Sequence, residues 1–402
     1  MVRTWSEIGG ERSEVGGRKA ALAGRTGYNP RMADDQQASR RDFLRGRAAL
    51  RALFDRTQRA ADEAAGALRP ARPQPEPAAP QRGLLLSARR RAMATEFQID
   101  YRASGGAEAT DAVLAALGLI ERIEDQLTVY RDWSEVVDIN HNAAARPVEV
   151  DPQLLTLLRL CDWLARATGG AFDITSGPLS RVWGFFRREG RIPDDEELAA
   201  ARAVVGYEKI ELSEQLSTIR FAQRGMEINF NSIGKGYALD RAAESLLQRG
   251  VDDFLMHGGH SSVLAWGSPR GDAAEGWSIG VPHPQRRNEN LGEVRLCNRA
   301  LGTAGDGTQF FEHEGRRYGH VIDPRTGQPS EGVFTATAVA DTAAEADALA
   351  TAFYVLGPGG TAEYCAAHDD VSAVLVCPSA ADDEFDVHTF NLAPSDWART
   401  DG

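Results

Sequence analysis

The sequence predicts an α+β fold in which short, largely antiparallel strands outnumber helices. Several predicted strands follow one another directly along the chain, as in residues 210–229 and 277–297. A doubly wound parallel sheet would instead alternate strands with helices. No repeat of solenoid period runs through the chain. We therefore expect a single large domain of mixed sheets with packed helices.

Composition excludes several classes of protein. The 402 residues are 42% hydrophobic, which is enough to bury a large core. The formal net charge of −13 argues against a nucleic-acid partner. The four cysteines show no C-x-x-C spacing and predict neither a disulfide framework nor a zinc knuckle. No apolar run approaches the roughly 20 residues that a membrane span needs, so no transmembrane span is expected.

Residues 1–83 are expected to lie outside the folded domain, which we place at residues 84–402. They form an Arg-, Ala- and Pro-rich tail that is expected to be disordered and ends in an extended linker. Residues 39–45 match a twin-arginine export signal. The residues that follow, 46–69, read as a charged amphipathic helix and not as the apolar segment that export requires. A cytoplasmic location is therefore favoured, with export as the alternative.

The first half of the domain combines one strand with three helices. Residues 93–101 alternate apolar and polar side chains, as a half-buried strand does. Apolar residues at helical spacing predict a helix at 110–127. A second helix is predicted at 152–167, ended by Gly169 and Gly170, and a short acidic helix at 194–204. A polar loop is expected over residues 128–142.

A strand, a turn and a helix are predicted over residues 226–250. Residues 226–230 alternate like a strand, and Gly250 is placed to end the helix. Asn231 or Ser232 would cap that helix, with Lys235 in its first turn. The unpaired N–H groups and the positive end of the dipole would suit a phosphate there. The same residues also fit a plain strand, cap and helix with a solvated lysine.

The second half continues with short strands and turns. Strands are predicted at 254–256, 277–281, 294–297 and 335–340, and turns at 303–307 and 325–327. His257 and His260 are three residues apart, which fits a pair of metal ligands, but a structural role is more common for two such histidines.

A helix is predicted at residues 342–357, from a capping box at Thr342 and Glu345 to the stop at Gly357. Asp347 and Thr351 are four residues apart, so their oxygens share one helical face. Two such hard oxygen ligands suit Mg²⁺. A solvated aspartate beside a packed threonine would give the same pattern.

Taken in order, these segments resemble the FAD:protein FMN transferase family (ApbE-like flavin transferases). The resemblance covers residues 93–357, nearly all of the predicted domain. The segments that carry it are Met93-Ala94-Thr95; Tyr130, Ser134-Glu135 and Asn140; residues 170–179 with Trp183-Gly184; residues 229–240; residues 320–329; and residues 346–352. One such match would be weak, but this many in the family's order are specific.

The resemblance implies a T-fold-like domain, an activity and a set of site residues. In that family Mg²⁺ and FAD bind together, and FMN passes to a threonine or serine hydroxyl of an acceptor protein while AMP leaves. The implied Mg²⁺ ligands are Ser232 (through its carbonyl), Asp347 and Thr351. The implied FAD-site residues are Met93, Tyr130, Ala171, Phe172, Asp173, Asn229 and Ile322, with Lys235 on a phosphate.

His320 is the predicted base that deprotonates the incoming hydroxyl. A histidine held within a strand-to-turn junction explains the same residue equally well. An acidic protein that binds a pyrophosphate needs a cation and a lysine to offset the ligand's charge, which agrees with the implied Mg²⁺ and Lys235.

Three positions depart from the family pattern. Asn229 replaces an aspartate, and His260 and Ala304 each stand in a turn where the family has a different residue. These departures keep two alternatives open. One is a protein that binds FAD without transferring FMN, and the other is an enzyme that hydrolyses FAD to FMN and AMP.

Of two unrelated motifs, the sequence disfavours the first and excludes the second. Ser232 and Lys235 fit the S-x-x-K of penicillin-interacting hydrolases, but no S-D-N motif accompanies them and Arg325-Thr326-Gly327 lies in a predicted turn. A P-loop would require a glycine five residues before Gly234 and a Ser or Thr after Lys235, and neither is present.

Overall fold

The computed structural model describes residues 84–103, 107–269, 276–284, 286, 289–305, 309–379 and 384–400. The predicted tail of residues 1–83, with its twin-arginine-like motif and amphipathic helix, lies outside these residues. The boundary at residue 84 and the location of the protein therefore stay predictions.

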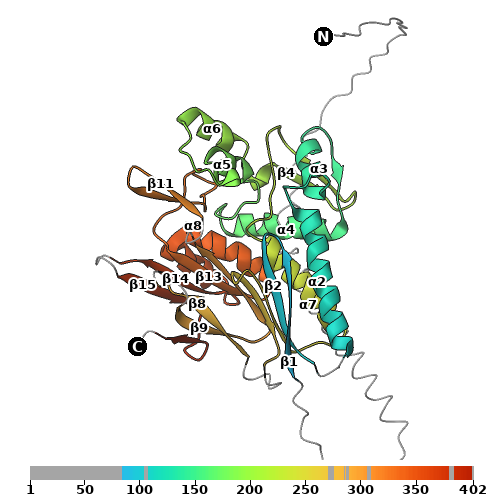
Figure 1. Cartoon of the computed structure of the whole chain (residues 1–402). Helices are drawn as coiled ribbons and strands as arrows, with labels where there is room; N and C mark the ends of the chain where they lie inside the picture. Colours follow the sequence, from blue (N-terminus) through green and yellow to red (C-terminus); the bar gives the residue numbers. More distant parts are fainter. Residues whose placement is uncertain are drawn as a thin grey trace, which may run out of the picture. The chain divides into compact units, whose positions relative to one another are not determined.

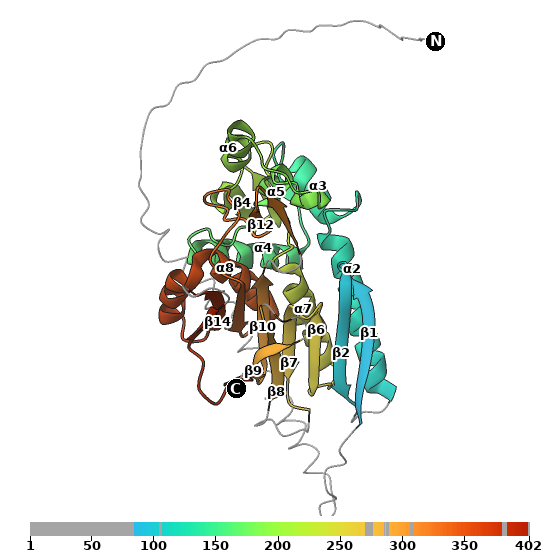
Figure 2. The ribbon, with the colours of Figure 1, turned by 60° about the vertical axis from the view of Figure 1, so that its left-hand side comes forward.

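An eight-stranded antiparallel sheet forms the centre of the described part, in the order β1-β2-β6-β7-β10-β13-β14-β15 (Figures 1 and 2). Its outer strands are joined by hairpins, whereas β2 and β6 pair across more than 150 intervening residues. Its strands are β1 (Leu85–Ala92), β2 (Thr95–Arg102), β6 (Phe254–Gly258), β7 (Ser262–Trp266), β10 (Arg299–Gly305), β13 (Thr335–Ala340), β14 (Ser372–Pro378) and β15 (Phe385–Phe390).

Three helices cover one face of this sheet: α2 (Ala107–Leu127), α7 (Gly234–Leu247) and α8 (Ala343–Ala367) (Figure 1). Each turns a buried stripe toward the strands, such as Val113, Leu117 and Ile120 of α2. Together they enclose the main hydrophobic core. The buried residues of α7 and α8 are mostly small, which lets both helices approach the sheet closely.

A second, three-stranded sheet packs on part of the opposite face. Its strands are β16 (Trp397–Arg399), β9 (Asn290–Leu296) and β8 (Trp277–Pro282), in that order. Trp277 and Ile279 of this sheet share a separate core with Val263 of the central sheet. The central strands are therefore buried on both faces. In β7 the buried residues do not alternate with exposed ones, and all of them after Ser262 are apolar.

The remaining elements lie beyond one end of the central sheet, at the top of Figure 1. The helices are α3 (Glu135–Asn142), α4 (Pro152–Ala167), α5 (Gly177–Val182) and α6 (Asp195–Ala203), with short 3₁₀ turns at Phe185–Arg187 and Tyr207–Lys209. The strands are β3 (Val148–Glu149), β4 (Ile210–Ser213), β5 (Thr218–Phe221), β11 (Phe310–His313) and β12 (Arg316–Gly319).

The predicted α+β class with largely antiparallel sheets is confirmed, and so are most of its elements. The predicted helix at 152–167 and the strand at 335–340 match α4 and β13 to the residue. The predicted loop at 128–142 is wrong in its second half, because Ser134 caps α3 there. Residues 226–230 form no strand, and residues 303–305, predicted as a turn, belong to β10.

The predicted end of the last helix at Gly357 is also partly wrong. Gly357 has left-handed backbone dihedrals (φ +66°), which break the helix as expected. A further helical stretch starts at Pro358, a residue that the first turn of a helix tolerates, and α8 continues past the kink to Ala367.

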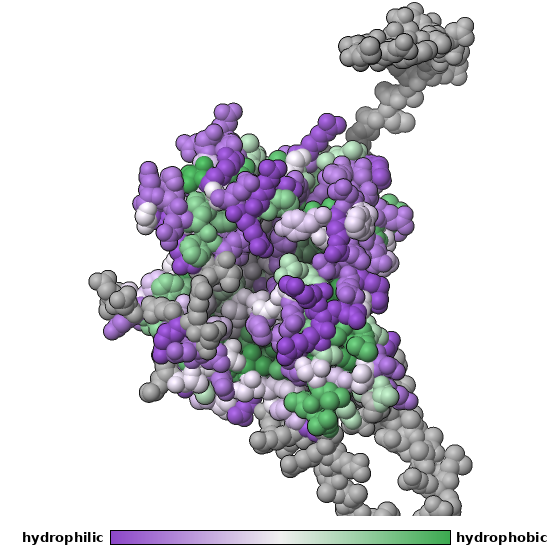
Figure 3. Space-filling view, in the orientation of Figure 1, coloured by the Kyte–Doolittle hydropathy of each residue, from purple (hydrophilic) through white to green (hydrophobic). Residues whose placement is uncertain are grey.

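The surface in view is mostly hydrophilic, with small separate groups of hydrophobic residues (Figure 3). Large apolar side chains that remain exposed include Tyr130 and Trp133, which lie in the loop between α2 and α3. Among the described residues, none of the helices combines the length and the hydropathy that crossing a bilayer requires.

Candidate functional site

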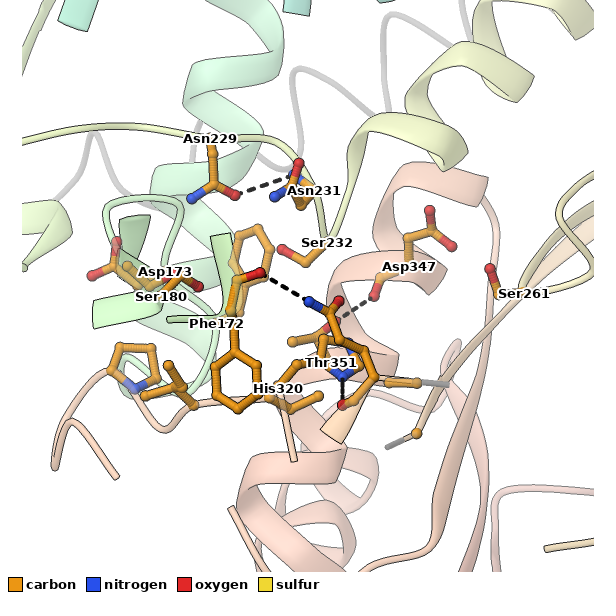
Figure 4. Close-up of a pocket in the computed structure, with 18 of the residues that line it drawn as sticks. Phe172, Asp173, Ser180, Asn229, Asn231, Ser232, Ser261, His320, Asp347 and Thr351 are labelled. Atoms are coloured by element: carbon orange, nitrogen blue, oxygen red, sulfur yellow. Dashed lines mark hydrogen bonds between the residues drawn. The ribbon is translucent and has the colours of Figure 1, made fainter. Parts of the chain in front are cut away.

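A pocket of about 360 Å³ lies between α7 and α8 on one side and the segments around α5 and after β12 on the other. Figure 4 shows side chains from separate parts of the chain converging on it. It contains all but one of the predicted site residues, namely Tyr130, Ala171, Phe172, Asp173, Asn229, Ser232, Lys235, His320, Ile322, Asp347 and Thr351. Met93 is the exception: it occupies the tight turn between β1 and β2 with a positive φ of 49°, and it does not line this pocket.

The segment before α7 is held in place by a side chain and not by a sheet. Asn140 of α3 accepts a hydrogen bond from Ile228 N at 2.8 Å and donates one to Ile228 O at 3.0 Å. The backbone N–H of Asn229 donates to Ile174 O at 2.9 Å. With these groups already bonded, residues 226–230 have no ladder to join. Asn229 itself faces the pocket, where its side chain accepts from Asn231 N.

The predicted caps of α7 are wrong. The N-cap residue is Ile233, which has no side-chain cap, and neither Asn231 nor Ser232 bonds the first turn. Instead Gly236 N donates to Oδ2 of Asp347 at 2.8 Å. A buried carboxylate from another helix therefore caps α7, and this N–H group is not open to an external anion.

Asp347 is a buried carboxylate of the pocket, with 6% of the residue exposed. Its Oδ2 also accepts from the Ser262 hydroxyl at 2.9 Å and lies 3.9 Å from Lys235 Nζ. Burial raises the pKa of Asp347 above its ordinary value, while Lys235, Ser262 and Gly236 oppose that shift. Its other oxygen, Oδ1, has no hydrogen-bond partner among the described residues.

The two helices cap each other. Asp240 of α7 accepts hydrogen bonds from Ala343 N at 2.8 Å and Ala344 N at 2.9 Å, at the start of α8. Asp347 of α8 returns the contact to Gly236 of α7. The helices lie so close that a Cβ on Gly236 would stand 2.0 Å from Ala343 O, so only glycine fits there.

The residues beside Asp347 fit the predicted Mg²⁺. Within the described residues no three His, Cys, Asp or Glu side chains form a metal-binding group. A cation here would depend on Oδ1 of Asp347 and on neutral oxygens. Thr351 follows one turn later and donates to the Asp347 carbonyl at 3.3 Å, which leaves its oxygen lone pairs available. Ser232 lines the same pocket (Figure 4), so the hard oxygen ligands that Mg²⁺ prefers are present.

Asp173 also lines the pocket, and its carboxylate already accepts three hydrogen bonds from the protein. Its Oδ1 accepts from Thr175 N at 2.8 Å and from the Thr175 hydroxyl at 2.7 Å, and its Oδ2 accepts from Tyr207 N at 2.9 Å. Burial raises the pKa of Asp173 despite these bonds. Its direct role is therefore to fix the turn that presents Ala171 and Phe172 to the pocket.

His320 stands across the pocket from the Asn229 segment (Figure 4). Its Nδ1 lies 3.1 Å from the carbonyl oxygen of Gln309. A carbonyl only accepts, so Nδ1 carries the proton and Nε2 of the neutral ring is the basic nitrogen. Ile322 lies just beyond, paired with Pro329 across a narrow turn.

Aromatic and basic side chains form the rim of the pocket. Tyr130 is 65% exposed and stacks on Phe186, with ring centroids 5.1 Å apart. The Arg181 guanidinium also lies over the Phe186 ring, 4.2 Å from its centroid, and pairs with Glu227. A planar ligand entering the pocket would meet these rings first.

His257 and His260 lie outside the residues that line the pocket. Their rings stack with centroids 4.3 Å apart, and His260 has a positive φ of 63°. Burial and the neighbouring His260 lower the pKa of His257. No metal-ligand group includes them among the described residues.

Three residues that organise the site were not predicted: Gly236, Asp240 and Ser262. The motif around Lys235 contains the first two, and a glycine one residue after a site lysine could have indicated a close backbone approach. Ser262 carries no comparable signal, because it lies in an apolar strand far from Asp347 in the sequence.

Comparisons with known proteins identify relatives of this chain. The model of the ApbE family matches residues 93–375. A curated relative from Vibrio cholerae, named FAD:protein FMN transferase, is 30% identical over 272 residues, which make up 66% of this chain and 79% of the relative. The solved ApbE protein of Thermotoga maritima has a TM-score of 0.66 at 28% identity and covers 73% of this chain and 94% of its own. The flavinyl transferase ApbE of Pseudomonas stutzeri, in its apo form, has a TM-score of 0.66 at 27% identity and covers 77% of this chain and 98% of its own.

Proposed function

Because the chain belongs to the ApbE family, we propose that it transfers FMN from FAD to a threonine or serine hydroxyl of an acceptor protein, with Mg²⁺ bound and AMP released. The enzyme is a flavin transferase, as its curated relatives and structural neighbours are. The metal, the acceptor hydroxyl and the leaving nucleotide are the proposed part.

One observation carries the proposal. Lys235, Asp347 and Thr351 line one pocket together with His320, and within the described residues Oδ1 of Asp347 has no hydrogen-bond partner. The reaction requires positive charge beside a pyrophosphate, which Lys235 and a cation on Asp347 and Thr351 would supply. It also requires a base for the acceptor hydroxyl, which His320 would be.

Lys235 would hold a phosphate of FAD. Its ammonium group lies 3.9 Å from Asp347 Oδ2, and its side chain is one-quarter exposed and lines the pocket. Asp347, Thr351 and Ser232 would hold Mg²⁺, which supplies positive charge to the phosphoryl oxygens. The chain's own residues then work mainly by positioning the substrate.

His320 would take the proton from the acceptor hydroxyl through Nε2. Its hydrogen bond to the Gln309 carbonyl favours the tautomer with the proton on Nδ1, which is the tautomer that a base acting through Nε2 needs. The hydroxyl oxygen would bond to the phosphorus of FMN while the bond to the AMP phosphate breaks.

The test uses the purified full chain with FAD, Mg²⁺ and a library of candidate acceptor domains. We expect an acceptor that gains one FMN by mass and an equal amount of AMP, both dependent on Mg²⁺. Asn229 supplies no carboxylate to the pocket, which favours a hydrolytic side reaction as the second candidate. FMN that appears only free in solution, with every acceptor, would replace transfer with FAD hydrolysis.

A further inference from the structure

Ser262 is buried in the middle of the central sheet, and its hydroxyl points at the pocket's buried carboxylate. Its residue exposure is 0%, and Oγ donates to Asp347 Oδ2 at 2.9 Å. Serine is an unusual choice in β7, because the other residues of that strand are apolar. A hydroxyl buried so deeply requires a partner, and the partner it has is a functional group.

Ser262 lies between two glycines of the central sheet. Its direct neighbours in register are Gly258 on β6 and Gly302 on β10. A Cβ on Gly302 would lie 2.4 Å from Ala346 O, so the first turn of α8 rests on the bare backbone of the strand. Because α8 approaches the sheet so closely, Asp347 comes within hydrogen-bond distance of the Ser262 hydroxyl.

Oδ2 of Asp347 accepts two short hydrogen bonds, each from a different element of the fold. Gly236 N at the start of α7 and Ser262 Oγ on β7 lie 2.8 and 2.9 Å away. Both elements are rigid and well packed, so the carboxylate has little freedom to rotate. Oδ1 is thereby left as the oxygen without a partner among the described residues.

We infer that Ser262 is a positioning residue, which together with the Gly236 backbone holds Oδ2 of Asp347 so that Oδ1 is presented to a divalent cation. This inference rests on the proposed function, since it supposes that Asp347 is a metal ligand. Ser262 does not itself touch the metal or FAD. It corresponds to the outer hydrogen bonds that orient metal ligands in other proteins, whose loss costs about 10- to 100-fold in metal affinity.

Mg²⁺-dependent FAD binding tests the inference directly. FAD fluorescence is followed in the full chain while Mg²⁺ is titrated, and the concentration of Mg²⁺ at half-saturation is compared between variants. We expect Ser262→Ala to raise that concentration about tenfold or more. At saturating Mg²⁺ its turnover should return close to the wild-type value, because only the orientation of the ligand has been weakened.

Ser372→Ala is the matched control. Ser372 is also a buried serine of the central sheet, and its hydroxyl donates to Asn391 O at 2.9 Å, away from the pocket. Both variants should lower the melting temperature to a similar degree, whereas only Ser262→Ala should change the requirement for Mg²⁺. Ser262→Cys keeps the size and a weak donor, so we expect a smaller rise in half-saturation, and it decides the question if Ser262→Ala does not fold.

Two outcomes would overturn the inference, and they are distinguishable. If the wild type needs Mg²⁺ and the Ser262 variants keep its half-saturation within twofold, the positioning role is wrong while the metal site stands. If the wild type binds FAD equally well without Mg²⁺, the metal site of the proposed function is wrong and the role of Ser262 fails with it.

Discussion

At the scale of single residues, the pocket depends on a carboxylate whose two oxygens have different tasks. Oδ2 of Asp347 accepts hydrogen bonds from Gly236 and Ser262, whereas Oδ1 has no hydrogen-bond partner among the described residues. Burying a carboxylate costs free energy unless positive charge stands near it. Lys235 supplies part of that charge at 3.9 Å, and a bound cation would supply the rest.

Asp347→Asn is expected to separate binding from stability. Burial raises the pKa of Asp347, so a neutral isostere relieves a desolvation cost, and the free energy of unfolding should stay equal or increase. The amide cannot replace the negative charge, so Mg²⁺ affinity and transfer should fall by at least about a hundredfold. Calorimetric titration with Mg²⁺ and thermal melting, on the same samples, measure the two effects. A variant that keeps wild-type Mg²⁺ affinity would exclude Asp347 as a ligand.

The free energy of unfolding is expected to depend on pH through His257. Burial and His260 lower its pKa, and Arg89 acts in the same direction, while Asp100 and Glu96 oppose the shift. A histidine whose folded pKa is depressed stabilises the fold above its unfolded pKa, and that stability is lost as the pH falls below about 6.5 through the folded value.

His257→Asn should remove this part of the acid sensitivity. Between pH 7.5 and 5.5 the wild type is expected to lose more unfolding free energy than the variant, because the amide does not take up a proton. Urea unfolding at several pH values measures the difference. Equal losses in both proteins would show that other groups govern the acid response.

At the scale of elements, the site is the junction of two helices that cap each other. Asp240 of α7 bonds the first two N–H groups of α8, and Asp347 of α8 bonds the first turn of α7. Each carboxylate lies at the positive end of the other helix's dipole. The position of Asp347 and Lys235 in the pocket is thus set by the packing of α7 on α8.

Gly236→Ala tests this packing against a matched glycine. The added methyl would overlap Ala343 O, so we expect a loss of about 1–3 kcal/mol of stability, together with weaker Mg²⁺-dependent FAD binding. Gly359, past the kink in α8, has open space around its Cβ position and no positive φ. Gly359→Ala should therefore leave binding unchanged and stabilise the helix by roughly 0.5–1 kcal/mol. Chemical denaturation and FAD titration of both variants provide the comparison, and a neutral Gly236→Ala would contradict the close approach.

At the scale of the described domain, the pocket draws on elements that are remote in the sequence. Phe172 precedes α5, Asn229 precedes α7, His320 follows β12 and Thr351 lies in α8. A ligand that contacts all of them binds only the folded domain and therefore stabilises it against unfolding.

FAD and Mg²⁺ are expected to raise the melting temperature cooperatively. At about 100 times its dissociation constant a ligand adds about 2.7 kcal/mol, which corresponds to a shift of several degrees for a domain of this size. FAD and Mg²⁺ together should give that shift, and each alone should give much less, because under the proposed function each ligand would offset the charge of the other. Thermal melts in the four conditions measure the coupling. Additive shifts would mean that the two ligands bind independently.

The sequence by itself determined the fold class, most of the elements and nearly all of the pocket-lining residues that we named. Helix α4 and strand β13 follow from local periodicity and turn residues, which act over a few neighbouring positions. The motif residues were recognised by type and order, and Met93 was the one that lies outside the pocket lining.

Only the tertiary structure decided which polar groups satisfy one another. Residues 226–230 have a strand-like pattern, yet Asn140 takes the backbone bonds of Ile228. Asn231 and Ser232 are good caps, yet Asp347 caps α7 from more than 100 residues away. A backbone group bonds to the partner that lies nearest in space, and no local pattern records that distance. For the same reason Ser262 became visible as part of the site only through the approach of α8 to β7.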